Sequence, residues 1–262
     1  MTLRLVVPVV ALLLAAACSR TAPAPAADAA SAPAATATGA TPAATATATP
    51  VDPAAQAAVA DILASTAAAP APVAGTDYVE IPNGQPLEPL DGKAEVVEIF
   101  GYTCPHCATF APLMSAWKSI APADVRITYL PAPFGGYWIP YAKAYYTADA
   151  LGIAGETHDA MFAALHLSGE LPIQNATAEE IGRWYAANAD VDAGEFATAM
   201  ESFGIDAKLK RATQFIQRSG VNGTPTLVVN GKYRVTGPDP LRIASHLVAM
   251  ERAAREGAAA QP

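Results

Sequence analysis

The sequence predicts an α/β fold in which a long helical block interrupts a run of strands. Short β-branched runs at Ala94–Phe100 and Val125–Leu130 indicate buried strands. Apolar residues spaced three or four apart indicate helices through most of residues 140–219. The pair Asn230-Gly231, between two short apolar runs, indicates a β-hairpin. The predicted order is therefore two strands, a helix, a strand, the helical block, a hairpin and a closing helix.

The composition excludes several classes of protein. The 262 residues carry 16 basic and 24 acidic side chains, for a formal net charge of −8. Because binding to nucleic acid needs concentrated lysine and arginine to neutralise phosphates, we expect no nucleic-acid partner. Three cysteines are too few for a dense disulfide scaffold. After residue 20, no apolar run approaches the ~20 residues that span a bilayer.

The first 17 residues are typical of a secretion signal. Arg4 precedes the apolar run Leu5–Ala17, which is short for a membrane span and contains Pro8. Small residues then lead to Cys18, so the segment resembles a bacterial lipoprotein signal in which Cys18 is acylated and becomes the mature N-terminus. Residue 15 is alanine, where such signals more often have leucine. The alternative is an ordinary cleavage site, which removes Cys18 or leaves it as a free thiol.

Residues 18–75 are predicted to be a disordered tether. Alanine, proline and threonine make up 42 of the 55 residues from 21 to 75, and this stretch has no aromatic side chain. With so few large apolar groups, it cannot bury a core that offsets the entropy lost on ordering. A transient helix over Val51–Ala69 is compatible with its alanine content. The sequence therefore predicts a lipid anchor at Cys18 followed by a long, sparsely charged tether.

A folded domain is predicted over residues 76–255. Its first strand alternates polar and apolar residues at Asp77–Ile81, and a helix with regular apolar spacing follows the second strand at Cys104–Trp117. Thr177, with Glu180 three residues later, has the pattern of a capping box. The remaining helices and the hairpin strands are predicted at Tyr141–Ala150, Glu156–Leu167, Ala178–Asn188, Ala193–Phe203, Asp206–Ser219, Thr226–Asn230, Lys232–Val235 and Leu241–Arg255.

The run Cys104-Pro105-His106-Cys107 holds the candidate chemistry. Two cysteines three positions apart can be half of a zinc site, a structural staple or a redox dithiol. A zinc site needs four ligands, and the sequence has neither a second such pair nor histidines at ligand spacing, so no metal is expected. A staple across so short a loop restricts the unfolded chain little. Thiol–disulfide exchange is therefore the favoured interpretation.

The position of this pair, between a buried strand and a helix, suits thiol–disulfide exchange. Cys104 at the start of the helix faces unpaired backbone N–H groups and the positive end of the helix dipole, which favour a thiolate. His106 can add a positive charge or a hydrogen bond to the same sulfur. Cys107, one turn further on, is expected to be buried and to act as the resolving thiol. The other histidines are interpreted as surface or helix-packing residues: His158, His166 and His246.

The run from Glu98 to Cys107, EIFGYTCPHC, resembles the active-site strand and helix of the DsbA family of periplasmic thiol:disulfide oxidoreductases. This family has a thioredoxin fold with an inserted helical domain, and the block from about residue 140 to 203 matches that insertion. Residues 221–226, VNGTPT, resemble the cis-proline loop that faces the dithiol. The resemblance covers about residues 76–255. It implies that a redox-active disulfide between the two cysteines takes the place of a cofactor.

Three further residues gain roles from this resemblance. A cis bond before Pro225, which the residues alone leave open, would present the Thr224 backbone to an incoming peptide. Glu98 lies in an otherwise apolar strand, either as a solvent-facing edge residue or, as the resemblance implies, as a buried carboxylate that accepts the proton of Cys107. Some relatives pair this glutamate with a lysine on the neighbouring strand, where this chain has only Arg126.

The leading hypothesis is a monomeric periplasmic enzyme that donates the Cys104–Cys107 disulfide to thiols of reduced or unfolded secreted proteins. Cys104 forms the mixed disulfide, Cys107 resolves it, and His106 stabilises the Cys104 thiolate. The resemblance implies reoxidation by a DsbB-type membrane protein that passes electrons to quinone, and Cys18 would anchor the enzyme to a membrane. The alternatives are a membrane-tethered disulfide reductase or isomerase of the same fold, and a chaperone with a vestigial dithiol. Pro-His between the cysteines favours oxidation.

Overall fold

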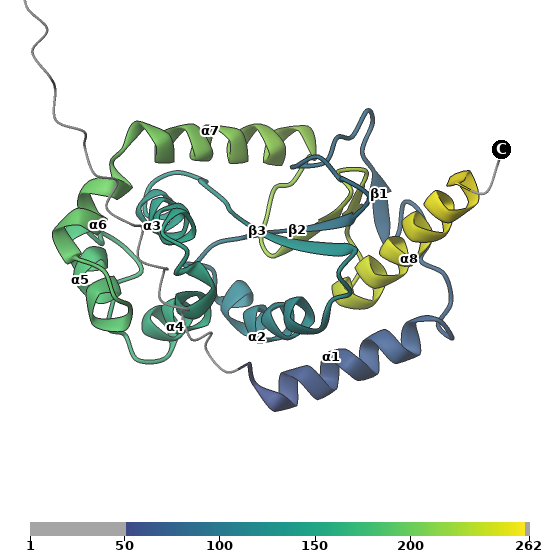
Figure 1. Ribbon diagram of the computed structural model, residues 1–262, viewed down its shortest axis with the longest axis horizontal. Coiled ribbons are helices and arrows are strands. Elements are labelled where there is room, and N and C mark those ends of the chain that lie inside the picture. Colours follow the sequence, from purple (N-terminus) through teal and green to yellow (C-terminus); the bar gives the residue numbers. More distant parts are fainter. Residues whose placement is uncertain (1–50, 260–262) are drawn as a thin grey trace, which may run out of the picture. The chain divides into compact units, whose positions relative to one another are not determined.

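A computed structural model describes residues 51–259, and within them a five-stranded mixed sheet has helices on both faces (Figure 1). The sheet order is β1-β5-β4-β2-β3. β2 and β3 are parallel, whereas the other neighbouring pairs are antiparallel. The strands are β1 (Tyr78–Glu80), β2 (Ala94–Phe100), β3 (Val125–Pro131), β4 (Thr226–Val229) and β5 (Tyr233–Val235).

Eight helices accompany this sheet in the described part of the chain. From α2 onward they follow the predicted order, and most of their ends lie within three residues of the predicted ones. The four helices α3 to α6 stand between β3 and the long helix α7, where the inserted block was expected. The helices are α1 (Pro53–Thr66), α2 (Pro105–Ile120), α3 (Trp138–Ala150), α4 (Ala154–His166), α5 (Ala178–Asn188), α6 (Ala193–Met200), α7 (Phe203–Arg218) and α8 (Pro240–Ala259).

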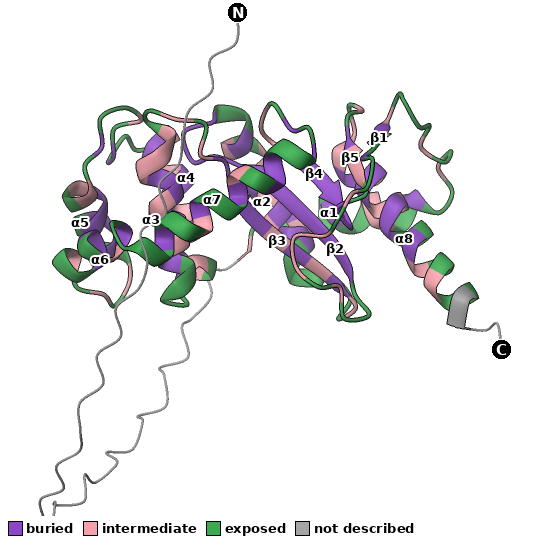
Figure 2. Ribbon diagram, turned by 90° about the horizontal axis from the view of Figure 1, so that it is seen from above, coloured by how far each residue is buried: buried purple, intermediate pink, exposed green. Residues whose placement is uncertain are grey.

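Strand β2 separates two apolar layers and is buried along its whole length (Figure 2). Val97 and Ile99 belong to the layer that α7 covers, together with Phe215. Val96 and Phe100 belong to the opposite layer, which contains the buried side chains of α2 and α8. Because side chains alternate along a strand, Glu98 projects from the same face as Val96 and Phe100. The sheet therefore aims Glu98 toward the helix that begins with the dithiol.

Local sequence signals account for the start of α5 and for the turn between β4 and β5. The Thr177 hydroxyl accepts a hydrogen bond from the Glu180 backbone N–H, and the Glu180 carboxylate accepts one from the Thr177 N–H, so the predicted capping box is confirmed. Asn230 and Gly231 have φ angles of 50° and 65°. Positive φ at two successive residues is the geometry of a type I′ turn, so the hairpin prediction is also confirmed.

The tether prediction is wrong for its last part, because residues 53–66 form helix α1. Asp52 caps this helix by accepting a hydrogen bond from the Ala54 N–H, and Pro53 occupies its first turn. Val59 is fully buried and Ala55 nearly so, in the same core as α2 and α8. Small alanine side chains allow the helix to approach its neighbours closely, so little apolar area suffices for docking. Residues 1–50, including Cys18 and the signal, lie outside the described residues.

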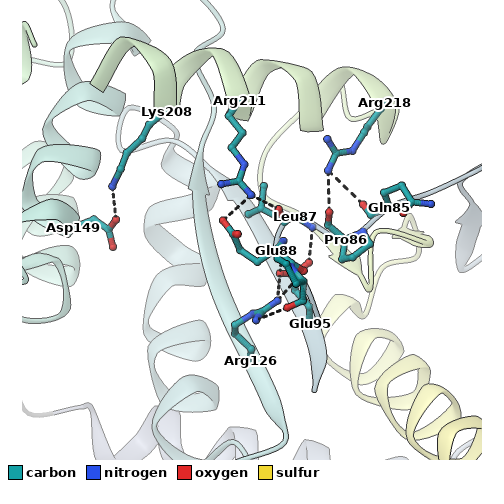
Figure 3. A network of polar contacts seen from close by, with 11 residues as sticks. Gln85, Pro86, Leu87, Glu88, Glu95, Arg126, Asp149, Lys208, Arg211 and Arg218 are labelled. Atoms are coloured by element: carbon teal, nitrogen blue, oxygen red, sulfur yellow. Dashed lines mark hydrogen bonds and ion pairs between the residues drawn. The ribbon is translucent and has the colours of Figure 1, made fainter. Parts of the chain in front are cut away.

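A buried carboxylate fastens the loop between β1 and β2 to the sheet (Figure 3). Glu95 is inaccessible to solvent and accepts hydrogen bonds from the backbone N–H groups of Leu87 at 2.8 Å and Glu88 at 3.2 Å. Its charge is paired with Arg126 on β3 at 2.8 Å. Arg211 of α7 pairs with Glu88 and donates to the Leu87 carbonyl, so the loop is also attached to α7. The ion-pair partner of Arg126 is therefore Glu95.

Candidate active site

The dithiol lies at the start of α2. Cys104 is the N-cap residue of this helix and Pro105 occupies its first position, where proline's missing N–H costs nothing. The Cys107 backbone N–H donates a hydrogen bond to Cys104 Sγ at 3.4 Å. The sulfur thus takes the place of the side-chain oxygen that usually caps a helix. Both cysteines are free thiols in this structure, which is the reduced form.

The two thiols differ in access and in proton affinity. Cys104 keeps 7% of its surface exposed, whereas Cys107 has none. Hydrogen bonds from the Cys107 thiol and from the Cys107 and His106 backbone N–H groups lower the pKa of Cys104 to about 5, against the opposing effect of burial. The hydrogen bond to Cys104 and burial raise the pKa of Cys107. The accessible sulfur is therefore the thiolate, and the enclosed one holds its proton.

His106 is exposed beside this pair. Its backbone N–H, rather than its ring, is the group that lowers the pKa of Cys104. No hydrogen bond joins its ring to Cys104 Sγ among the contacts of residues 51–259. The sequence anticipated a ring contact with the sulfur, and in the reduced form the Cys107 thiol and the helix backbone supply this stabilisation instead.

The loop before β4 brings a distant part of the chain to the dithiol. The bond between Thr224 and Pro225 is cis, as the resemblance implied. The Thr224 carbonyl oxygen lies 3.5 Å from Cys104 Sγ, although 120 residues separate them in sequence. Thr226 donates a hydrogen bond to the Gly223 carbonyl and so closes the loop on itself. Backbone groups of this loop therefore lie next to the accessible sulfur of Cys104.

Glu98 is buried, with 1% of its surface exposed, and its Oε2 has no hydrogen-bond partner. β2 is an inner strand, so the edge interpretation is wrong. Burial, the charge of Asp159 and the charge of Cys104 together raise the pKa of Glu98 to about 8. A carboxyl group with this pKa can both give and take a proton near neutral pH, which is the property that a buried proton carrier needs.

Glu98 has no basic partner on the neighbouring strand. Its register partner on β3 is Tyr129, and Arg126 is paired with Glu95. The Tyr129 hydroxyl lies 3.4 Å from Ser115 Oγ, which donates a hydrogen bond to Asp159 Oδ1 at 2.8 Å. The nearby side-chain charge with the largest effect on the pKa of Glu98 is thus that of a second carboxylate, Asp159.

Sequence reasoning missed His158, which is buried at the centre of an aromatic cluster rather than merely packed on a helix. Its Nδ1 lies 3.0 Å from the Tyr102 hydroxyl, and its ring stacks on Tyr129 at 4.3 Å between centroids. Burial lowers the pKa of His158 to about 3, so the ring is neutral at physiological pH. Tyr102 stands two residues before Cys104, and the only sequence signal was the density of tyrosine and phenylalanine around the motif.

Other features of the described residues bear on cofactors and membranes. No three His, Cys, Asp or Glu side chains between residues 51 and 259 are grouped as a metal ion would require. None of the helices in the same range combines the length and the apolar character needed to cross a bilayer. Cys18, the predicted lipid-bearing residue, lies outside that range.

This arrangement can exchange disulfides. A thiolate that is stabilised at Cys104 is a good leaving group, and Cys107, one helical turn deeper, can close a disulfide with it. Because stabilising the thiolate stabilises the reduced form, the disulfide of such a pair is readily reduced and therefore oxidises other thiols. Glu98 lies on the sheet face below this helix and can carry the proton that Cys107 gains or loses.

Comparison with known proteins agrees with this chemistry. A family model described as thioredoxin matches residues 90–244. The thiol:disulfide interchange protein DsbA of Pseudomonas aeruginosa is 38% identical over 187 residues, which cover 69% of this chain and 86% of that protein. The counterpart in Azotobacter vinelandii is 36% identical and is covered to 85%.

Solved structures give the same result. The crystal structure of the oxidoreductase DsbA from Xylella fastidiosa superposes with a TM-score of 0.68 and 48% identity, over 70% of this chain and 98% of that chain. The crystal structure of Pseudomonas aeruginosa DsbA gives a TM-score of 0.64 and 37% identity. The thioredoxin fold with an inserted helical domain is therefore confirmed, and the chain belongs to the DsbA family of protein-disulfide oxidoreductases.

Proposed function

We propose that this enzyme works as an oxidase in the periplasm, where it donates the Cys104–Cys107 disulfide to thiols of reduced secreted proteins. The observation that carries this direction is the contrast between the two sulfurs. The accessible Cys104 has a lowered pKa and the enclosed Cys107 a raised one. Such a pair gains stability on reduction, so electrons flow from substrate to enzyme.

The proposed reaction uses four groups of this chain. A substrate thiolate attacks Cys104 Sγ, the Cys104–Cys107 bond breaks, and Cys107 leaves with the electron pair and takes a proton from Glu98. A second substrate thiolate then attacks the substrate sulfur of the mixed disulfide and releases Cys104 as a thiolate. His106, exposed beside Cys104, contributes its backbone N–H to the stabilisation of that thiolate. On reoxidation, Glu98 accepts the proton of Cys107 before Cys107 resolves the mixed disulfide.

A groove beside the cis-proline loop supports a polypeptide substrate. A cavity of about 440 Å³ is lined by Pro225, Leu227 and Phe110, and Asn222 and Arg234 are among its polar lining residues. Pro225 has no N–H, so the Thr224 carbonyl is the backbone group that the loop offers next to Cys104. An extended peptide placed there would lie with its cysteine over the accessible sulfur.

The remaining parts of the proposal concern location and partners. The lipoprotein-like signal supports acylation of Cys18, which would hold the enzyme at a membrane through residues 19–52. A quinone-linked membrane protein of the DsbB type would return the dithiol to the disulfide form, and the enzyme would act as a monomer. Intact-mass measurement of the mature protein tests the anchor, because a diacylglyceryl or triacyl adduct on a chain that begins at Cys18 is expected. A soluble mature chain that lacks Cys18 would contradict it.

Trapping of mixed disulfides tests the oxidase direction. The variant Cys107→Ala cannot resolve an adduct, so it should accumulate disulfide-linked complexes between Cys104 and secreted proteins, and Cys104→Ala should form none. Cells that lack the protein should secrete its captured partners with free thiols. If those partners instead become more disulfide-bonded when the protein is absent, the enzyme is a reductase or isomerase.

A further inference from the structure

A cavity of about 400 Å³ lies between α2 and α4, and no residue of the cis-proline loop lines it. The first two turns of α2 form one wall, from Pro105 to Pro112, and α4 forms the other. At 1.5 Å of rise per residue, this wall extends about 10 Å from the residue that follows Cys104. The volume falls in the range of small ligand pockets and is sufficient for one long side chain.

The cavity is mostly apolar but contains one carboxylate. Ala108 and Phe162 line its walls, and Leu167 stands at its edge with 85% of its surface exposed. Two of the polar residues in its lining are engaged elsewhere, because Thr109 donates to the Pro105 carbonyl and His166 Nε2 donates to the Tyr102 carbonyl at 2.7 Å. Asp159 is the one acidic residue of the lining.

Asp159 lacks a cationic partner. Its Oδ1 accepts the hydrogen bond from Ser115, and no ion pair between residues 51 and 259 includes its carboxylate. Its other oxygen, Oδ2, is not among the enclosed side-chain atoms without partners, and Asp159 is part of the cavity lining. A half-buried carboxylate in the lining of a mostly apolar cavity attracts a group with a long aliphatic stem and a positive head.

We propose that this cavity is a substrate subsite that takes a lysine or arginine side chain near the reacting cysteine of the polypeptide, with the charged head against Asp159. The proposal rests on the proposed function, since the side chain belongs to a polypeptide bound at Cys104. An extended chain advances about 3.4 Å per residue, so a residue two or three positions from the substrate cysteine lies over the α2 wall. The aliphatic stem of that lysine or arginine side chain would pack on Ala108, Phe162 and Leu167.

Synthetic dithiol peptides that differ at one position test this subsite. The residue three positions from the reacting cysteine is lysine, norleucine or glutamate, so that norleucine keeps the stem and loses the charge. With the wild-type enzyme, kcat/KM for oxidation should be about fivefold higher for the lysine peptide than for the norleucine peptide, and lowest for the glutamate peptide. Added salt should shrink the preference, because the ion pair is partly open to solvent.

Two matched variants separate a local effect from a change of net charge. Asp159→Asn should bring the ratio of lysine to norleucine rates close to one, whereas Asp149→Asn, which removes a carboxylate paired with Lys208, should keep it. General damage to the fold lowers all rates together and does not move this ratio. Equal rates for the two peptides with wild type, or a preference that survives in Asp159→Asn, would overturn the proposal.

Equilibrium binding separates this proposal from the proposed function. Affinities of the same peptides with serine in place of cysteine can be measured on the Cys104→Ser variant, where no exchange occurs. A lysine preference in binding without any peptide oxidation would support the subsite and reject the oxidase. Oxidation of all peptides at equal rates, with equal affinities, would support the oxidase and reject the subsite.

Discussion

Replacing Glu98 with glutamine should change how the stability of the reduced protein depends on pH. The buried carboxyl has a pKa of about 8, against an ordinary value of 4.5, chiefly because burial disfavours the charged form. Between these two pH values the folded state holds a proton that the unfolded state has released. Stability therefore falls as pH rises through this window, and levels off above pH 8. Glutamine cannot titrate, so the variant lacks this loss.

The size of the effect follows from the same two values. Each pH unit between 4.5 and the working pH costs 1.36 kcal/mol while the folded carboxyl stays protonated, so the penalty at pH 7 is about 3 kcal/mol. The buried amide of glutamine has its own cost, but that cost is the same at every pH. The free energy of unfolding of Glu98→Gln minus that of wild type should therefore grow by about 3 kcal/mol between pH 4.5 and pH 7.

Urea unfolding of the reduced proteins at half-unit steps from pH 4 to pH 8.5 measures this difference. Glu80→Gln, on the exposed side of β1, controls for the loss of one carboxylate. Other groups around Glu98, namely Asp159, Cys104, Tyr129 and Tyr145, are common to both proteins and largely cancel in the difference. A difference that stays constant with pH would show that Glu98 is ionised in the fold, and the proton-carrier role would fail.

Three further predictions concern the dithiol, the docking of α1 and the ion pair between Arg126 and Glu95. The reduced protein should melt at a higher temperature than the oxidised one at pH 7, as calorimetry of the two forms can show. Since the pKa of Cys104 is lowered from 9.0 to about 5, this difference in melting temperature reaches its full size only above pH 9 and should disappear as pH falls through 5. An oxidised form that melts higher at pH 7 would contradict the oxidase direction. Val59→Ala should cost about 2 kcal/mol in urea unfolding because Val59 is fully buried, and an unchanged midpoint would show that α1 does not dock. Arg126→Met should lower the free energy of unfolding by ~2 kcal/mol because it leaves the Glu95 carboxylate buried without its cation. Faster amide exchange at Leu87 should accompany this loss, and unchanged stability would show that the Arg126–Glu95 pair does not stabilise the fold.

Much of the fold was predictable because local signals agreed with the tertiary structure. The β-branched run of β2 and the helical spacing of α2 gave the central strand and the active-site helix, and Asn230-Gly231 gave the hairpin. The two cysteines at the start of α2 were sufficient to predict which thiol is accessible, since position in a helix turn decides it.

The errors arose where packing decided the outcome rather than composition. Residues 53–66 have the alanine content of a linker, but Asp52 and Pro53 form a helix start, and α2 and α8 offer a surface that two small side chains can fill. The environment of Glu98 also depends on partners from other elements. Asp159 on α4 and the commitment of Arg126 to Glu95 follow from how the layers meet, which no local pattern records.

The equilibrium of the Cys104–Cys107 pair with reduced and oxidised glutathione at pH 7 tests the central claim most directly. The helix start and the Cys107 thiol stabilise the Cys104 thiolate only after reduction, so the protein disulfide should be more oxidising than glutathione disulfide. Excess reduced glutathione should therefore convert the protein to the dithiol, which the loss of the disulfide on mass analysis of quenched, alkylated samples reports. A disulfide that persists under those conditions, as a reductase's or a structural disulfide would, contradicts the account.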